Sequence, residues 1–287
     1  MAGNVPIRES VGAALRFVRE NIRFIAVASV AGAAALTLIG GLNLVAPQFG
    51  FVTTIVSSVM QVMVYAVFLG ASLFGSAEAR TRWLNDGMRV WAAMAIIGFF
   101  LFIVMFVAFI IAGIVMAAGP LAPYMSDLTE AGSDEAAVMA VMVRFAEANP
   151  VAVLLFTLFF ATIWMLLTSR LYLAAPATVD QQRILSFETW SWTKGAMLRI
   201  TGARLLLLIP ANLFVGAIGH LIGRLVDVDT LDPVTHAAAA SSNPAGYLAF
   251  VFVTGVLTFA LYSALEAGLS SYLYRGLKPA EAQTPPA

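Results

Sequence analysis

The sequence predicts an all-α fold, a polytopic transmembrane bundle of six spans with interfacial amphipathic helices. Of the 287 residues, 61% are hydrophobic and 11% are charged. A soluble domain carries about 25% charged residues, so this chain lacks the polar groups to cover a globular surface. Six apolar runs each exceed the roughly 20 residues that a helix needs to cross a bilayer.

The six spans are expected within one transmembrane domain, residues 1–275. Their predicted bounds are residues 22–45, 51–76, 90–118, 150–175, 201–223 and 246–274. Pro176 is expected to end the fourth span and Pro210 to interrupt the fifth. The polar, Pro-rich residues 276–287 are expected to form a disordered cytoplasmic tail.

Two amphipathic helices are expected at the membrane surface. Residues 4–20 place apolar side chains at helical spacing, and this helix should lie in the interface and turn at Asn21. Residues 134–148 should form a second surface helix, in the loop between the third and fourth spans. Ser133 is a suitable N-cap for this second helix.

Basic residues are concentrated on one predicted face. Fourteen of the sixteen Lys and Arg residues precede the first span, follow the sixth, or lie at the second-to-third and fourth-to-fifth connections. The positive-inside rule makes this face cytoplasmic, so both termini should lie inside the cell. The net charge is zero, so nucleic acid is not an expected partner.

Three basic segments on this face resemble one another. They are FVRENIR (17–23), WLNDGMR (83–89) and WTKGAMLR (192–199), and each precedes a pair of spans whose second member has a central aromatic residue: Tyr65, Trp164 or Tyr262. One interpretation is a threefold internal repeat of helix pairs joined by interfacial helix-turns. The alternative is that every inner boundary of a membrane protein needs aromatic residues, arginines and a turn residue.

The basic and aromatic residues of these segments are candidates for lipid contact. We expect anionic lipid to bind at the cytoplasmic face, although ordinary interfacial anchoring would use the same residue types. In the connection to the fifth span, Ser186 is a suitable helix cap, and Gly195 is expected to end that helix in a left-handed conformation. The lipid-interface candidates are Arg16, Arg19, Arg82, Trp83, Trp190, Trp192, Lys194 and Arg199.

Glu266 is the one acidic residue within a predicted span. An ionisable residue inside a membrane is a functional candidate by default, and a structural ion pair is the competing interpretation. Arg170 lies near the inner end of the fourth span, and both residues are expected roughly 10 Å below the cytoplasmic interface. The sequence therefore predicts an intramembrane pair between Arg170 and Glu266.

The segments RLYLAAPATV (170–179) and FETWSWTKGAMLRI (187–200) resemble a pattern in a family of bacterial integral membrane proteins. That family includes the membrane domain attached to some glycerophosphodiester phosphodiesterases. The matching positions are Arg170, Pro176, Ser191, Trp192, Thr193, Lys194 and Gly195. The resemblance implies a six-span bundle in the bacterial cytoplasmic (inner) membrane. Only the tail 276–287 follows the last span where those enzymes carry a catalytic barrel, so hydrolase activity is not expected.

No catalytic motif is found in the sequence, and neither an enzyme activity, a cofactor nor a metal site is expected. The preferred hypothesis is a non-enzymatic module that binds lipid or a membrane partner, including a second copy of the chain. A transporter of small solutes or lipid is an alternative. An accessory to glycerophospholipid metabolism is a third hypothesis, suggested by the resemblance.

Overall fold

A computed structural model of the chain describes residues 5–228 and 233–279, with the backbone alone for residues 233–237. Every regular element in these ranges is helical, and six helices are long and apolar enough to cross a membrane. The predicted all-α class with six spans is therefore confirmed. Of the tail expected to be disordered, residues 280–287 lie outside the described part of the chain.

Five of the six spans are single helices, and the sixth has three parts. The spans are α2 (Ile22–Val45), α3 (Gly50–Phe74), α4 (Ser76–Ala118), α7 (Pro150–Arg170), α10 (Met197–Arg224), and α12 (Pro244–Leu257) continued by the π-helical η3 (Thr258–Ser263) and α13 (Ala264–Leu277). The shorter elements are α1 (Ile7–Glu20), η1 (Pro47–Phe49), η2 (Ala122–Tyr124), α5 (Met125–Ala131), α6 (Glu135–Ala148), α8 (Ala174–Gln181), α9 (Thr189–Trp192) and α11 (Pro233–Ser242).

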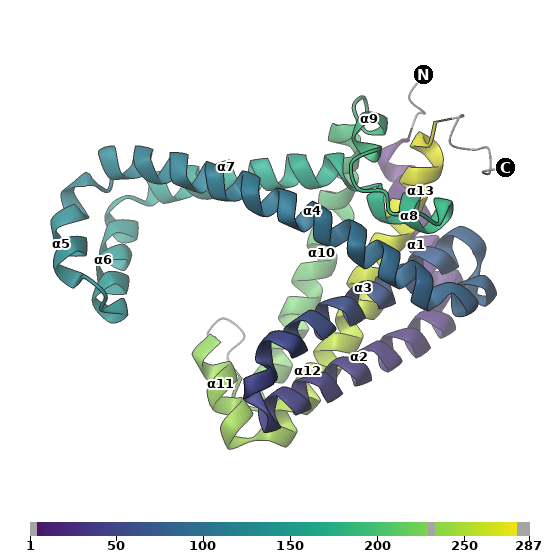
Figure 1. The fold of residues 1–287 in the computed structure, drawn as a ribbon, viewed down its shortest axis with the longest axis horizontal. Coiled ribbons are helices and arrows are strands. Elements are labelled where there is room, and N and C mark those ends of the chain that lie inside the picture. Colours follow the sequence, from purple (N-terminus) through teal and green to yellow (C-terminus); the bar gives the residue numbers. More distant parts are fainter. Residues whose placement is uncertain (1–4, 229–232, 280–287) are drawn as a thin grey trace. The chain divides into compact units, whose positions relative to one another are not determined.

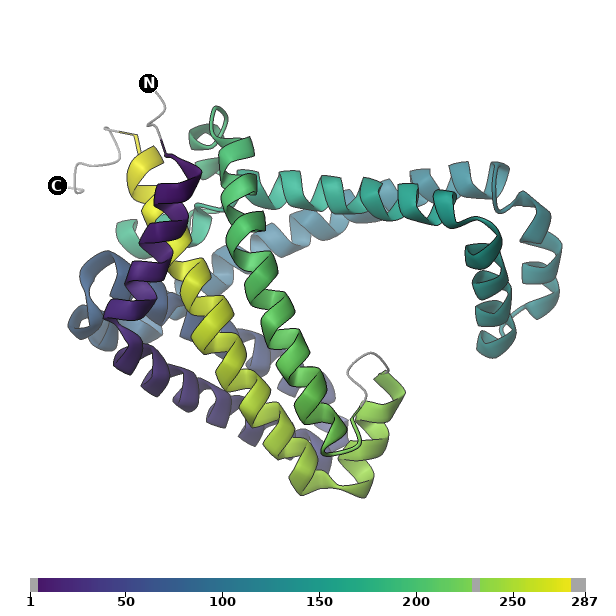
Figure 2. The same ribbon diagram turned by 180° about the vertical axis from the view of Figure 1, so that it is seen from behind.

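The helices form two compact units. The larger unit combines the chain up to residue 96 with the chain from residue 169 onward, and the smaller unit is Ile97–Thr168. Within the larger unit, α2 packs between α3 and α12, and α10 packs against the sixth span (Figures 1 and 2). The last helix, α13, also packs against α1, α3 and α8.

One face of helix α1 packs against the helices α13 and α10. Ser10, Ala14 and Phe17 are buried on this face. A Cβ atom on Gly268 of α13 would lie 3.0 Å from the Cα atom of Ala14, so this close approach requires glycine. The predicted turn at Asn21 is present, and the position of this helix in the membrane interface stays a prediction.

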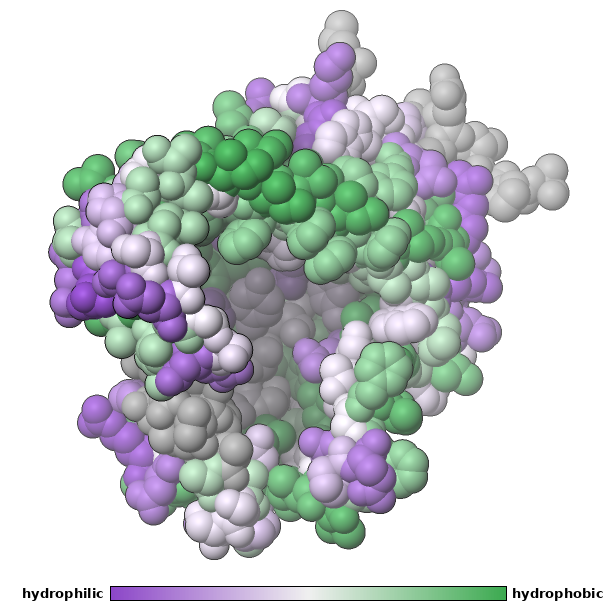
Figure 3. All heavy atoms as spheres, turned by 60° about the vertical axis from the view of Figure 1, so that its left-hand side comes forward, coloured by the Kyte–Doolittle hydropathy of each residue, from purple (hydrophilic) through white to green (hydrophobic). Residues whose placement is uncertain are grey.

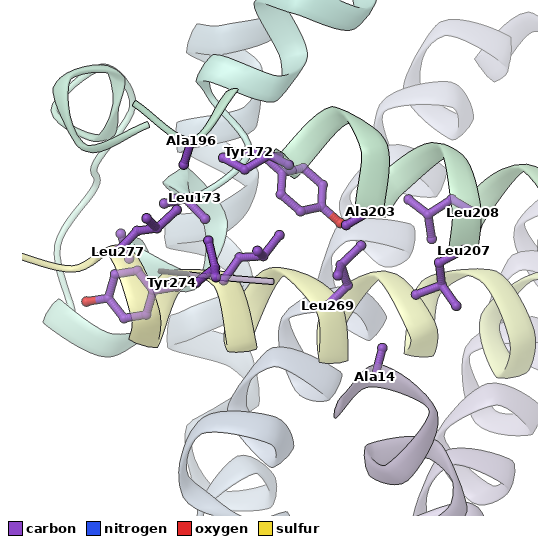
Figure 4. Close-up of a cluster of buried hydrophobic side chains, with 14 of the residues drawn as sticks. Ala14, Tyr172, Leu173, Ala196, Ala203, Leu207, Leu208, Leu269, Tyr274 and Leu277 are labelled. Atoms are coloured by element: carbon purple, nitrogen blue, oxygen red, sulfur yellow. The ribbon is translucent and has the colours of Figure 1, made fainter. Parts of the chain in front are cut away.

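The ends of the larger unit's helices form a layer that we call the cap, comprising residues 5–20, 169–204 and 264–279. Its apolar core includes Ala14, Tyr172, Leu173, Leu269 and Tyr274 (Figure 4). Buried hydroxyl residues are frequent in the cap: Ser10, Ser169, Thr178, Ser186, Thr189, Thr193, Ser270 and Ser271. Polar groups within a membrane core are costly, so this composition distinguishes the cap from the apolar helices that continue from it.

The polar segment before the third span is helical rather than a turn. Helix α4 begins at Ser76 and runs without interruption through WLNDGMR. Glu78, Arg82, Asp86 and Arg89 form ion pairs along one side of this helix, at spacings of three and four residues that support helical backbone. The helix-turn expected at all three basic segments is thus wrong at residues 83–89.

Three proline and capping predictions also change. Pro176 lies in the first turn of α8, where a missing N–H removes no helical hydrogen bond, and the fourth span ends earlier, at Arg170. Pro210 lies inside an unbroken α10. Asp134, not Ser133, caps α6 by accepting hydrogen bonds from the N–H groups of Ala136 and Ala137.

The connection before α10 also differs from its prediction. Ser186 is buried and donates to the carbonyl oxygen of Ala93 at 3.5 Å, and it caps no helix. Helix α9 begins at Thr189 and is four residues long. Among the described glycines, positive φ angles occur at Gly75 and Gly132, so Gly195 does not adopt the expected left-handed conformation. Short hydroxyl bonds to the neighbouring backbone hold this connection instead.

The smaller unit contains one end of α4, helices α5 and α6, and most of α7. Phe109 on α4 packs against Phe156 and Phe160 of α7, with ring centroids 6.4 and 6.2 Å apart. The predicted helix α6 is present, and it buries Val141 and Phe145. Its place on the membrane surface stays a prediction. Figure 3 shows broad apolar surfaces between separate hydrophilic patches, the pattern expected of helices that face lipid.

Candidate functional site

The lipid-interface candidates divide into exposed and packed residues. The side chains of Arg16, Arg19, Lys194 and Arg199 are exposed, and Trp83 is 45% exposed. Trp190, Trp192 and Arg82 are partly buried against the cap. Only the first group has the access that a lipid headgroup requires.

Arg82 links α4 to the cap. It donates a 2.9 Å hydrogen bond to the carbonyl oxygen of Val179 and pairs with Asp86 at 3.2 Å. Its guanidinium also lies 4.6 Å from the centroid of the Phe74 ring. These contacts join α4 to α8, so Arg82 has a structural role, and its predicted contact with lipid stays a prediction.

The two tryptophans pack within the connection from α7 to α10. The guanidinium of Arg170 lies 4.8 Å from the ring centroid of Trp190, and the Trp192 ring lies 6.3 Å from that of Tyr274. Thr193 donates to the carbonyl oxygen of Arg170 at 2.9 Å. These residues fix where α10 begins relative to the end of α7.

The same connection exposes a second set of residues on its outside. We call residues 182–199 the α9 elbow. Three large apolar side chains are exposed there, at 47%, 41% and 74%, and exposed basic residues lie beside them in the sequence. The apolar residues are Ile184, Phe187 and Leu198, and the basic residues are Arg183, Lys194 and Arg199. Apolar groups that enter lipid beside cations that meet phosphates are typical of an interfacial segment.

A second candidate is a polar cluster inside the larger unit, built around Arg204. This residue donates a 2.9 Å hydrogen bond to the hydroxyl of Ser169, which also accepts from Thr201 at 2.9 Å. The guanidinium lies 4.7 Å from the ring centroid of Tyr172. Arg204 is thus oriented by the end of α7 and the residues that follow it.

Glu266 faces this arginine. Its carboxylate interacts electrostatically with Arg204 and with the hydroxyls of Tyr65, Tyr172 and Tyr262. Among the described residues, no ion pair joins Glu266 to Arg170. Arg204, rather than the predicted Arg170, is therefore the arginine whose charge acts on Glu266, because Arg170 lies at the end of α7 over Trp190.

Three tyrosines from different elements complete the cluster, which we call the Arg204–Glu266 cluster. Tyr65 on α3 shares a 3.1 Å hydrogen bond with Ser270, and Tyr262 lies in the π-helical segment η3. Tyr172 is 8% exposed, and its hydroxyl has no hydrogen-bond partner in the structure. Buried tyrosine hydroxyls are normally bonded, so this group has an unused capacity to donate and accept.

Two observations place the cluster at the level where spans end. Gly41 lies against Leu248 and Gly32 against Phe259, so α2 is antiparallel to the sixth span. Two turns beyond Phe259, Glu266 is opposite Ile25, in the first turn of α2. Arg204 in turn bonds Ser169, next to the last residue of α7. The cluster thus lies beside the first turn of α2 and the last residues of α7.

The π-helical segment η3 lies just before Glu266 in the sixth span. A π turn inserts an extra residue into a helix, and such turns are frequent at functional sites. Here the segment Thr258–Ser263 contains Tyr262 and ends three residues before Glu266. Two of the three aromatic residues noted in the repeated pattern, Tyr65 and Tyr262, converge on Glu266. The third, Trp164, is 48% exposed in the smaller unit.

The comparisons with known proteins give no match: no family model, curated protein or solved structure matches the chain.

Proposed function

We propose that the protein is a non-enzymatic integral membrane module that binds anionic lipid through the exposed basic and aromatic residues of its cytoplasmic face. The α9 elbow is the observation that carries this proposal. Leu198 is 74% exposed and stands next to exposed Arg199. A basic residue near an anionic bilayer surface contributes about 1 kcal/mol of attraction. Arg16, Arg19 and Trp83 extend the same chemistry to α1 and α4.

The proposal includes an orientation and a location. The fourteen basic residues of one predicted face belong on the cytoplasmic side, which places both termini inside. A bacterial cytoplasmic membrane, with its anionic lipids, is the location suggested by the resemblance of residues 170–200. A second copy of the chain, or a membrane protein of glycerophospholipid metabolism, would be a partner at the same face.

A transporter is the second candidate function, and the Arg204–Glu266 cluster favours it. Charged side chains among membrane helices often mark substrate or ion pathways. The π-helical segment before Glu266 adds a local irregularity next to this cluster.

The test of lipid binding compares two double variants with equal loss of charge. Lys194→Gln with Arg199→Gln should weaken binding of phosphatidylglycerol by roughly 30-fold, because two residues contribute about 1 kcal/mol each. Arg144→Gln with Arg224→Gln, the two basic residues of the opposite predicted face, is the matched control. Titration of the detergent-solubilised full chain by native mass spectrometry measures both. Equal affinity in the two double variants contradicts the proposal.

A further inference from the structure

The formal charges of the Arg204–Glu266 cluster balance. Arg204 contributes one positive charge and Glu266 one negative charge, and the groups around them are uncharged hydroxyls. Arg170, the partner of Glu266 expected from the sequence, lies over Trp190. A site with no net charge, enclosed by apolar helices, disfavours any ligand that leaves one charge without a partner.

The cluster also has an unused polar group at its centre. Tyr172 is more than nine-tenths buried, and its hydroxyl lacks a partner although its ring packs under Arg204. Figure 4 shows this tyrosine within the apolar cluster of the cap, beside Ala203 of α10. A ligand that places an acceptor beside Arg204 would also be within the reach of this hydroxyl, since both side chains belong to one stacked pair.

We propose that the Arg204–Glu266 cluster binds a zwitterionic group, with its acidic end at Arg204 and Tyr172 and its ammonium end at Glu266. Tyr65 and Tyr262, which interact electrostatically with Glu266, supply aromatic groups beside the ammonium, a surrounding that suits an organic cation. Each buried charge then keeps a partner of opposite sign when the ligand enters. This inference is independent of lipid binding by the α9 elbow, which uses other residues.

A purely anionic or purely cationic ligand fits this site less well. An anion bound at Arg204 would leave the carboxylate of Glu266 without its counter-ion in surroundings of low dielectric constant. A cation bound at Glu266 would leave Arg204 in the same condition. Removing one partner of a buried pair is strongly unfavourable, whereas a ligand that carries both signs replaces both partners.

Two sources can supply this chemistry. A phospholipid headgroup such as phosphoethanolamine carries a phosphate and an ammonium, and a free amino-acid-like zwitterion carries a carboxylate and an ammonium. The level of the cluster, opposite the first turn of α2 and beside the end of α7, suits a headgroup that remains attached to its acyl chains. The experiment therefore includes a lipid and a soluble form of the same group.

The experiment measures binding to the detergent-purified full chain by native mass spectrometry. The probes are phosphatidylethanolamine, phosphatidylglycerol, soluble phosphoethanolamine and glycine. Tyr172→Phe should bind phosphatidylethanolamine roughly tenfold more weakly than the wild type, because it loses one hydrogen bond to a charged group. Tyr272→Phe is the matched control, since it removes a hydroxyl from α13 that bonds Glu9.

The relative affinity for zwitterionic and anionic lipid gives the second readout. Glu266→Gln leaves Arg204 as the one formal charge of the cluster. In a chain that also carries Lys194→Gln and Arg199→Gln, which removes the phosphatidylglycerol site of the α9 elbow, Glu266→Gln should change the preferred lipid from phosphatidylethanolamine to phosphatidylglycerol. Gel-filtration elution and melting temperature show whether each variant is folded. Soluble phosphoethanolamine or glycine that binds while phosphatidylethanolamine does not would assign the site to a free zwitterion.

Two results would overturn the proposal. One is that the wild type and Tyr172→Phe bind both the lipids and the soluble zwitterions with equal affinity, which would mean that the Tyr172 hydroxyl contacts no ligand. The other is that Glu266→Gln leaves the order of lipid preference unchanged. Failure of the α9 elbow variants to lose phosphatidylglycerol would leave this inference standing, because the two experiments change different residues.

Discussion

At the scale of single residues, the buried carboxylate of Glu266 depends on a counter-ion for its stability. The structure pairs Glu266 electrostatically with Arg204, while Arg170 stacks on Trp190. Glu266→Leu and Arg204→Met should each destabilise the protein by about 3–5 kcal/mol, and the double variant should recover a coupling of about 0.5–3 kcal/mol. Unfolding in detergent measures the cycle.

The same measurement with Arg170→Met supplies the control for that cycle. Residues that share no contact have additive effects to within about 0.5 kcal/mol, so Glu266→Leu and Arg170→Met should simply add. Coupling to Arg170 that equals or exceeds the coupling to Arg204 would restore the pair predicted from the sequence.

The sequence identified Glu266 because it is an acid within an apolar run. Its partner could not be found in the same way, because hydropathy gives depth along each helix but not which helices are neighbours. Arg204 belongs to α10, which packs on the sixth span. Tyr172 lies in the turn between α7 and α8, which hydropathy does not predict. Tyr65 and Tyr262 are recurrent aromatic positions in the sequence, but the repeat does not indicate that both lie beside Glu266.

At the scale of elements, the polar first part of α4 makes a testable packing contact. A Cβ atom on Gly87 would lie 2.7 Å from the Cγ atom of Met63 and 3.3 Å from its Cα atom, whereas one on Gly98 would meet nothing within 4 Å. Gly87→Ala should therefore destabilise the protein by about 1–3 kcal/mol through overpacking. Gly98→Ala should stabilise it by up to about 1 kcal/mol, because alanine favours helix more than glycine does.

Thermal unfolding of the two alanine variants in the same detergent compares these effects. Equal shifts in melting temperature would mean that residues 76–89 do not pack as a helix against α3. The helix-turn predicted for 83–89 would then regain support.

The sequence predicted where the elements lie better than it predicted their ends. The first span has its predicted bounds, Ile22–Val45, because Asn21 and Pro47 flank it. The third begins fourteen residues earlier than predicted, at Ser76 rather than residue 90. Charged residues report a polar environment, not a break in the backbone, and the ion pairs from Glu78 to Arg89 show that the helix continues there.

At the scale of the whole molecule, the length of each apolar run was enough to predict six spans. The number of spans can be predicted in this way because only helices and closed barrels satisfy all their backbone hydrogen bonds in lipid. The packing of α1 on α13 was beyond the sequence argument, because an amphipathic face fits a protein groove as well as a lipid surface. Close contact at Gly268 decides between them, and it is a tertiary feature.

The orientation of the six spans is the last prediction, and the absence of cysteine makes it direct to measure. Because each span crosses the membrane once, the loops at Glu130 and Ser242 should lie on one side and the α9 elbow on the other. Single variants Glu130→Cys and Ser242→Cys should react with a membrane-impermeant maleimide in intact cells. Glu188→Cys and Lys194→Cys, also exposed, should react only after lysis, because the basic face should be cytoplasmic. Reaction of the α9 elbow variants in intact cells would reverse the orientation, and reaction at one but not the other of residues 130 and 242 would contradict six spans.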